Sequence, residues 1–114
     1  GLADISELKF QRIPINSTHV YSNLSALYES GNDKVNRDDL ITILSEEYKI
    51  QPVVQNNPLY RYPLMIKAGF GKANCPNTDY FFDNMLSLPF YEWMEKDQLD
   101  YMVSSTREAI ERLR

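Results

Sequence analysis

Tyr60-Arg61-Tyr62 is the stretch of this sequence best suited to binding a charged ligand. An arginine guanidinium is a planar fork of N–H donors that fits a phosphate or a carboxylate in bidentate fashion. The neighbouring tyrosines allow a second interpretation, in which the guanidinium lies over aromatic rings at the surface or at an interface. The sequence leaves both interpretations open.

Lys72 lies in the motif GFGKA, which resembles part of a phosphate-binding loop. The motif lacks the leading glycine of that loop and the Ser or Thr that follows its lysine. We therefore expect no cofactor at Lys72.

The remaining reactive side chains have no visible catalytic partners. His19, the single histidine, has no nearby Asp or Cys, so we expect a structural hydrogen-bonding role for it. Cys75 stands alone, which excludes an internal disulfide and the cysteine pairs of zinc modules. Ser87 lies between two leucines without a base, which favours packing and a local hydrogen bond over nucleophilic catalysis. We expect no catalytic residue and no metal site in this chain.

Composition narrows the class of protein. The chain has 114 residues, enough for one domain with a modest core, and 43% of them are hydrophobic and 25% charged. Its net charge of −4 makes nucleic acid an unexpected partner. No apolar stretch is long enough to span a bilayer, and no charged-then-apolar leader opens the chain. We expect a cytoplasmic protein with no membrane partner.

Two elements of the first half are predicted from periodicity. Val20, Leu24, Ala26 and Tyr28 fall on alternate positions with Ser22 as the one gap, which indicates a strand with one buried face. Apolar residues at helical spacing predict a helix over 36–48, which Asn36 caps with its side-chain oxygen.

The flanking segments give weaker patterns. Residues 1–12 show weak helical spacing and are interpreted as a linker or the end of a connecting helix. Residues 50–56 (IQPVVQN) are predicted to form a short strand, with Pro52 at an edge or outside the hydrogen-bond ladder. The stretch 57–72 is predicted to be a structured loop with one helical turn near 62–68.

The last third of the chain predicts two helices and a strand. Asn77 or Thr78 is expected to cap a helix that ends near Met85, and Leu86-Ser87-Leu88 then forms a strand that Pro89 stops. An amphipathic helix is predicted from about residue 95 to the end. Together the elements predict an α+β fold, with a small, mostly antiparallel sheet packed against helices on one side.

Four motifs in order carry a resemblance to a known family. They are Arg37-Asp38-x-Leu40, Ile50, Pro76-Asn77-Thr78-Asp79 and Leu86-Ser87-Leu88-Pro89. In this order and spacing, from about residue 10 to 114, they resemble the C-terminal small domain of nucleotide-sugar aminotransferases of the DegT/DnrJ/StrS type. In that family the first motif is a helix, a Gly-Ile strand follows, and the last two motifs are a capped helix and a strand before the final helix.

The resemblance implies a fold-type I enzyme that depends on pyridoxal phosphate. Such an enzyme transfers an amino group from an amino acid, usually glutamate, to a keto-sugar nucleotide in surface polysaccharide or amino-sugar biosynthesis. The lysine that holds the cofactor and the acid that pairs with its pyridine nitrogen belong to the family's large N-terminal domain. None of the six lysines here stands in the family's glycine-rich lysine context. We therefore expect residues 13–114 to be a small domain that is not catalytically competent alone, from a homodimeric parent whose large domain binds the cofactor.

The resemblance also suggests which residues face the substrate. In the family a His-Tyr pair at the end of the strand after the first helix faces the cleft, and Gln55 and Asn56 occupy those positions here. Histidine can carry charge near neutral pH, whereas amides exchange only neutral hydrogen bonds. The substrate contact is therefore either rebuilt around Gln55 and Asn56 or moved to Tyr60 and Arg61, and these four residues are the predicted substrate-binding set.

A second class of function stays open beside the first. The opening Gly-Leu-Ala-Asp without an initiator methionine is typical of a segment cut from a longer protein. A strand-helix-strand followed by helix-strand could instead be a free-standing, ferredoxin-like interaction or ligand-sensing module. The motif series favours the aminotransferase domain.

Overall fold

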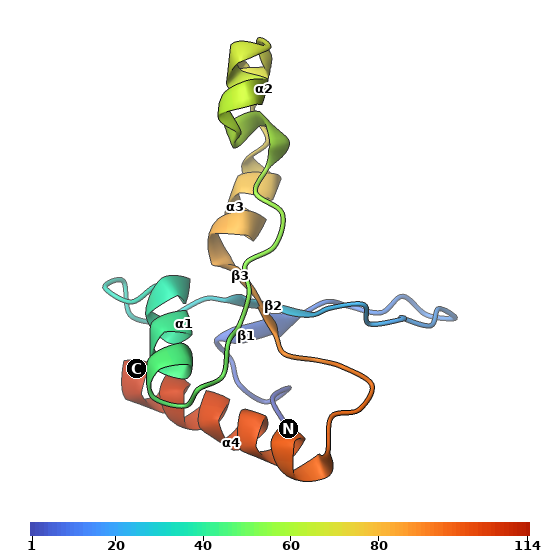
Figure 1. Cartoon of the computed structure of the whole chain (residues 1–114), viewed down its shortest axis with the longest axis vertical. Coiled ribbons are helices and arrows are strands. Elements are labelled where there is room, and N and C mark those ends of the chain that lie inside the picture. The colour runs from blue at the N-terminus through green and yellow to red at the C-terminus, as the bar shows by residue number, and fades with distance from the viewer.

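Three short strands form the sheet in the computed structural model, which describes residues 1–114. β1 (Leu8–Phe10), β2 (Leu24–Tyr28) and β3 (Met85–Leu88) lie in the order β1-β2-β3, and β2 pairs antiparallel with both neighbours. Figure 1 shows this sheet at the centre of the molecule. The predicted α+β class with an antiparallel sheet is confirmed.

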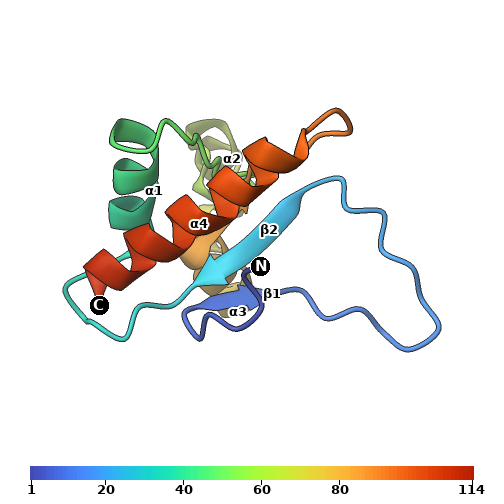
Figure 2. The same ribbon diagram turned by 90° about the horizontal axis from the view of Figure 1, so that it is seen from below.

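Two helices cover one face of the sheet and close the core. α1 (Arg37–Glu46) and α4 (Lys96–Leu113) are in contact, and α4 crosses α1 obliquely in Figure 2. Leu40 and Leu44 of α1 are completely buried, and Ala109 and Ile110 of α4 pack into the same cluster. Burying each leucine side chain stabilises the fold by about 1.5–3 kcal/mol.

The N-terminal segment differs from its prediction. Residues 1–12 contain no helix; turns lead into β1, and Leu2, Ile5 and Leu8 belong to the buried core. The helix predicted from the weak spacing is therefore wrong. The apolar residues pack against the sheet edge and α4 without forming a helix of their own. The segment therefore contributes buried side chains to the core.

The strand predicted around Val20 to Tyr28 forms only in its second half. β2 begins at Leu24, and Val20 is 87% exposed in the preceding loop. Tyr21 has a positive φ of 46°, which breaks an extended strand. The Asn36 cap is confirmed: its side chain accepts from the Asp38 N–H at 2.7 Å, and Asp39 completes a capping box.

The segment 50–56 lies at the sheet edge but makes only one bridge to it. Val53 and Ser87 exchange two backbone hydrogen bonds of 2.9 and 2.8 Å. A longer strand does not form, because Pro52 has no N–H to donate and Asn56 turns the chain with a φ of 59°.

Residues 57–84 form an arm that projects from the sheet (Figure 1). It consists of η1 (Leu59–Arg61), α2 (Pro63–Lys67), η2 (Phe70–Lys72) and α3 (Pro76–Asn84), so the predicted helical turn near 62–68 is confirmed as α2. Pro58 is the arm's one buried residue. The radius of gyration, 15.9 Å, exceeds the roughly 13 Å of a compact domain of this length because the arm extends the molecule.

For the last two helices, the predicted caps of α3 are wrong and the prediction of the final helix is confirmed. α3 begins with Pro76 at its first position after Cys75, so Asn77 and Thr78 lie inside the helix and the predicted caps are wrong. Proline fits there because its missing N–H has no helical partner in the first turn. The final helix is confirmed as α4, with Glu95 at its N-cap and Gln98 closing a capping box.

The element order also bears on the ferredoxin-like alternative. Two strands come first, followed by a helix, the arm, one strand and a helix. This order is not the β-α-β-β-α-β arrangement of ferredoxin-like folds. None of the helices combines the length and the apolar character that crossing a membrane requires.

Candidate functional site

The four predicted site residues lie on one segment, 55–61, which connects the sheet edge to the arm. The Val53–Ser87 bridge holds the start of this segment against β3. Pro58, which is buried, and η1 hold its end. The structure splits the four residues into two groups, with Gln55 and Asn56 at the sheet and Tyr60 and Arg61 on the arm.

Gln55 belongs to a row of neutral polar side chains that crosses the sheet edge. Its Nε2 donates to Asn23 Oδ1 at 3.1 Å, and its Oε1 accepts a long bond of 3.5 Å from Ser87 Oγ. Ser87 Oγ lies 2.7 Å from Ser25 Oγ on the neighbouring strand. We call these four residues the polar row. Its hydroxyl and amide groups can exchange neutral hydrogen bonds but offer no general base or charged clamp.

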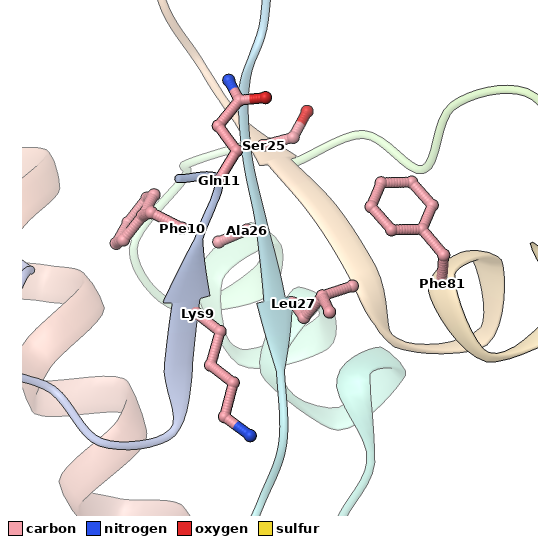
Figure 3. Close-up of a pocket in the computed structure, with 7 residues that line it drawn as sticks. All are labelled: Lys9, Phe10, Gln11, Ser25, Ala26, Leu27 and Phe81. Atoms are coloured by element: carbon pink, nitrogen blue, oxygen red, sulfur yellow. The ribbon is translucent and has the colours of Figure 1, made fainter. Parts of the chain in front are cut away.

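A hollow of about 150 Å³ continues from the polar row over the sheet face opposite α1 and α4. Figure 3 shows Gln11 and Ser25 at one end of the hollow and Lys9 at the other. Phe81 of α3 and Leu27 of β2 supply its apolar side (Figure 3). Lys9 is paired with Glu29, and this contact lowers the pKa of the Glu29 carboxyl.

Tyr60 and Arg61 face α3 and not the sheet. The Tyr60 hydroxyl donates to Asp79 Oδ1 at 2.9 Å, and burial together with this bond raises the pKa of Tyr60 to about 12. Arg61 Nε donates to the same oxygen at 2.9 Å, and Arg61 Nη1 donates to Asp83 Oδ1 at 2.7 Å. The guanidinium carbon lies 5.3 Å from the centre of the Phe82 ring. We call these residues the Arg61 network.

The contact with the Phe82 ring fits the second interpretation of this arginine, but carboxylates are its main partners. Two carboxylates engage the guanidinium, and they raise its pKa while holding the pKa of Asp83 below its ordinary value. A phosphate would have to displace one of these partners. The contacts therefore make Arg61 a tether between η1 and α3 in this chain.

Sequence reasoning missed two members of the polar row, Asn23 and Ser25. Neither lies in a motif, and their partners are 32 and 62 residues away. Ser87 does hydrogen-bond and is buried, but its partner is on another strand, so the predicted bond is not local. His19 is a structural acceptor as predicted, because its Nδ1 accepts from the Tyr21 N–H at 2.8 Å.

The lysines of this chain do not fit pyridoxal phosphate. A Schiff-base lysine needs a desolvated pocket with an acid for the pyridine nitrogen and donors for the phosphate. All six lysines are exposed, and the side chains of Lys9, Lys49 and Lys96 are engaged by Glu29, the Glu46 carbonyl and Asp100. No three His, Cys, Asp or Glu side chains are grouped to hold a metal ion.

Comparison with known proteins agrees with the four motifs. The model of the DegT/DnrJ/EryC1/StrS aminotransferase family matches residues 1–107. The chain belongs to this family. A relative is the spore coat polysaccharide biosynthesis protein SpsC of Bacillus subtilis (strain 168), which is 32% identical over 77 residues. That alignment covers 67% of this chain and 20% of SpsC, so the match spans about a fifth of the relative's length.

Proposed function

We propose that this chain is the C-terminal small domain of a fold-type I, pyridoxal-phosphate-dependent aminotransferase. The parent enzyme transfers an amino group from an amino acid, with glutamate as the expected donor, to a keto-sugar nucleotide. The product serves surface polysaccharide or amino-sugar biosynthesis. The family match over residues 1–107 carries this proposal. The name of SpsC, a spore coat polysaccharide biosynthesis protein, supports the sugar substrate.

The polar row supports a contact with the neutral part of the substrate. Sugar hydroxyls donate and accept hydrogen bonds, as do the amide of Gln55 and the exposed amide of Asn56. Tyr60 and Arg61 complete the proposed site on the arm side of the same segment. In this proposal Gln55 and Asn56 touch the nucleotide sugar, while the Arg61 network holds the segment that carries them.

The cofactor belongs to polypeptide outside this chain in the proposed parent, since the lysines here do not fit it. The parent is proposed to be a cytoplasmic homodimer. The chain mixed with pyridoxal phosphate and dialysed should therefore retain no visible cofactor absorbance. Borohydride reduction followed by mass spectrometry checks this. A single stoichiometrically labelled lysine would contradict the proposal that the cofactor is bound outside this chain.

Steady-state kinetics of the parent enzyme with Gln55→Ala tests the substrate assignment. Losing one neutral hydrogen bond costs about 1 kcal/mol, so KM for the sugar nucleotide should rise about fivefold. The half-reaction with the amino donor should not change, because the donor reacts at the cofactor. Gln51→Ala, an exposed glutamine four residues earlier, is the matched control. Equal kinetics for both variants would remove Gln55 from the site.

A further inference from the structure

The polar row is built by pairing across three neighbouring segments of the chain. Ser25 and Ser87 are direct cross-strand partners in β2 and β3, and Val53 is bridged to Ser87 from the other side. Residues directly opposite each other in an antiparallel pair place their side chains on the same face of the sheet. Gln55, two residues after Val53, returns to that face and reaches Ser87, which is only 2% exposed.

The protons available in the row decide which group donates to which. A serine hydroxyl has one proton, and that of Ser87 goes to Gln55 Oε1 in the longest bond of the row, 3.5 Å. In the 2.7 Å contact between the two serines, Ser25 Oγ is therefore the donor and Ser87 Oγ the acceptor. Because hydrogen bonds in series polarise one another, Ser25 strengthens the bond that Ser87 donates.

Asn23 holds the other end of the same amide. Gln55 Nε2 donates one N–H to Asn23 Oδ1 at 3.1 Å. An amide nitrogen carries two N–H groups, so a second donor of Gln55 has no partner within the chain. The Gln55 side chain is half-buried, which leaves this donor within reach of a ligand. The row therefore sets Gln55 to meet an acceptor atom.

We infer that Ser87, supported by Ser25, is a positioning residue that orients Gln55 so that its free N–H donates to an acceptor oxygen of the sugar nucleotide. The identity of the ligand rests on the proposed function, whereas the orientation of the amide does not. A side chain that is held in advance loses less conformational freedom on binding, so Ser87 strengthens binding through Gln55 without touching the ligand.

NMR of the 114-residue chain tests the orientation without a ligand. The heteronuclear NOE should show an ordered side-chain amide for Gln55 and a mobile one for the exposed Gln51. Ser87→Ala should make the Gln55 amide nearly as mobile as that of Gln51, and Asn23→Ala, at an exposed position, should also loosen it. Ser105→Ala removes another buried serine hydroxyl, on α4, and as the matched control should change nothing at Gln55. An amide that stays ordered in both row variants would overturn the inference.

Titration of the parent enzyme with UDP-glucose tests the contact with the ligand. This nucleotide sugar has hydroxyls in place of a keto group, so it binds without accepting an amino group. Ser87→Ala should raise the Kd for UDP-glucose about two- to tenfold. Adding Ser87→Ala to Gln55→Ala should cause no further rise, because the serine acts through Gln55. Gln55→Glu still accepts from Ser87 but has no N–H to donate, so it should also bind UDP-glucose more weakly.

The outcomes separate this inference from the proposed function. Weaker binding by Gln55→Ala beside unchanged binding by Ser87→Ala would overturn the positioning role. Tighter binding by Gln55→Glu would overturn the donor role, because a carboxylate favours a ligand that donates. If neither Gln55 variant changes the Kd while NMR shows the ordered amide, the substrate contact of the proposed function fails, and the donor role fails with it.

Discussion

Arg61 shows how one side chain can look like a ligand clamp in the sequence and act as an internal tether in the fold. Its donors are directed to Asp79 and Asp83 on α3, one helical turn apart. The side chains of the three residues are 32–55% exposed, so the pairs are partly screened by water. The bidentate geometry suited to a phosphate is here filled by two carboxylates of the same chain.

We expect Arg61→Ala to loosen the arm while leaving the core folded. Losing a partly exposed, branched ion pair should cost about 1 kcal/mol, chiefly as local opening of η1 and α2. Amide hydrogen exchange should accelerate in residues 59–67 and stay unchanged in α1 and α4. Lys67→Ala is the control, because the Lys67 side chain has no hydrogen-bond partner.

One kinetic result in the parent enzyme would contradict the role of Arg61 as a tether. If Arg61 clamps a phosphate, Arg61→Ala should raise KM for the sugar nucleotide by about one to two orders of magnitude, because a charge-assisted hydrogen bond contributes roughly 1.5–3 kcal/mol. That increase without faster exchange in η1 would restore the ligand-clamp interpretation.

At the scale of elements, the end of α1 depends on a residue in the left-handed region. Lys49 has a φ of 57°, and this turn lets the Ile50 N–H reach the Leu44 carbonyl at 2.9 Å. Such a conformation suits glycine, which is the residue that the family places before this isoleucine. Lysine therefore holds a strained backbone position between the helix and the sheet edge.

We expect Lys49→Gly to raise the free energy of unfolding by about 0.5–1 kcal/mol, because relief of the left-handed strain exceeds the added chain entropy of glycine. Urea denaturation measures the change. Lys34→Gly, at a position without positive φ, should instead be neutral or destabilising. A loss of stability in Lys49→Gly would show that the Lys49 Nζ bond to the Glu46 carbonyl outweighs the strain.

Arg37 joins α1 to the junction between α3 and β3. Its Nη1 donates to the carbonyls of Phe82 and Met85, each at 2.9 Å, and its side chain is only 10% exposed. These carbonyls lie where α3 ends and have no helical partner. Arg37, which opens the first family motif at the start of α1, therefore supplies hydrogen bonds to the carbonyls at the end of α3.

Arg37→Ala should lower the free energy of unfolding by about 2–3 kcal/mol, because it leaves two carbonyls without their charged donor. Arg37→Lys should recover part of this loss, since an ammonium donates without the planar fork. Denaturant titration of both variants checks the order. An alanine variant as stable as the original chain would mean that water replaces the guanidinium at no cost.

At the scale of the whole molecule, side chains from the last helix tie the two ends of the chain together. Arg114 Nε donates to Glu7 Oε1 at 2.6 Å, across 107 residues of sequence. Arg107 Nε donates to the Gly1 carbonyl at 2.9 Å. The N-terminal turns are therefore held to α4 by charge as well as by their buried leucines.

The Glu7 pair predicts a specific loss of stability in acid. The bond from Arg114, with help from Ser6, lowers the pKa of Glu7 from 4.5 to about 2. A lowered carboxyl pKa stabilises the fold fully above the unfolded value of 4.5, and this contribution disappears as the pH falls to about 2. We expect it to be on the order of 1–2 kcal/mol, because Arg114 is partly exposed. Thermal denaturation across this pH range measures it.

Glu7→Gln is the matched variant for the acid effect. It should be less stable than the original chain at neutral pH, and the difference should shrink toward pH 2, where Glu7 itself becomes neutral. A difference that stays constant over the range would assign the effect of Glu7 to packing and not to its charge.

The sequence by itself determined the elements whose chemistry is local. The 3.6-residue period and the Asn36 cap predict α1, and the same period predicts α4, because both signals lie within a few turns of one helix. The α+β class and the family motifs were also evident from the sequence. Within these elements, local preference and the final fold agree.

Only the tertiary structure decided what depends on distant partners. β1 exists because Leu8 and Phe10 pair with β2, while the spacing of Ile5 and Leu8 resembles a helix. Gln55 hydrogen-bonds to Asn23, 32 residues away in the sequence. Arg61 bonds to Asp79 of α3, 18 residues away. Such contacts form only when long loops close and bring distant segments together, and the core as a whole offsets the entropy cost of that closure. A short stretch of sequence therefore does not reveal which distant partners its residues will contact.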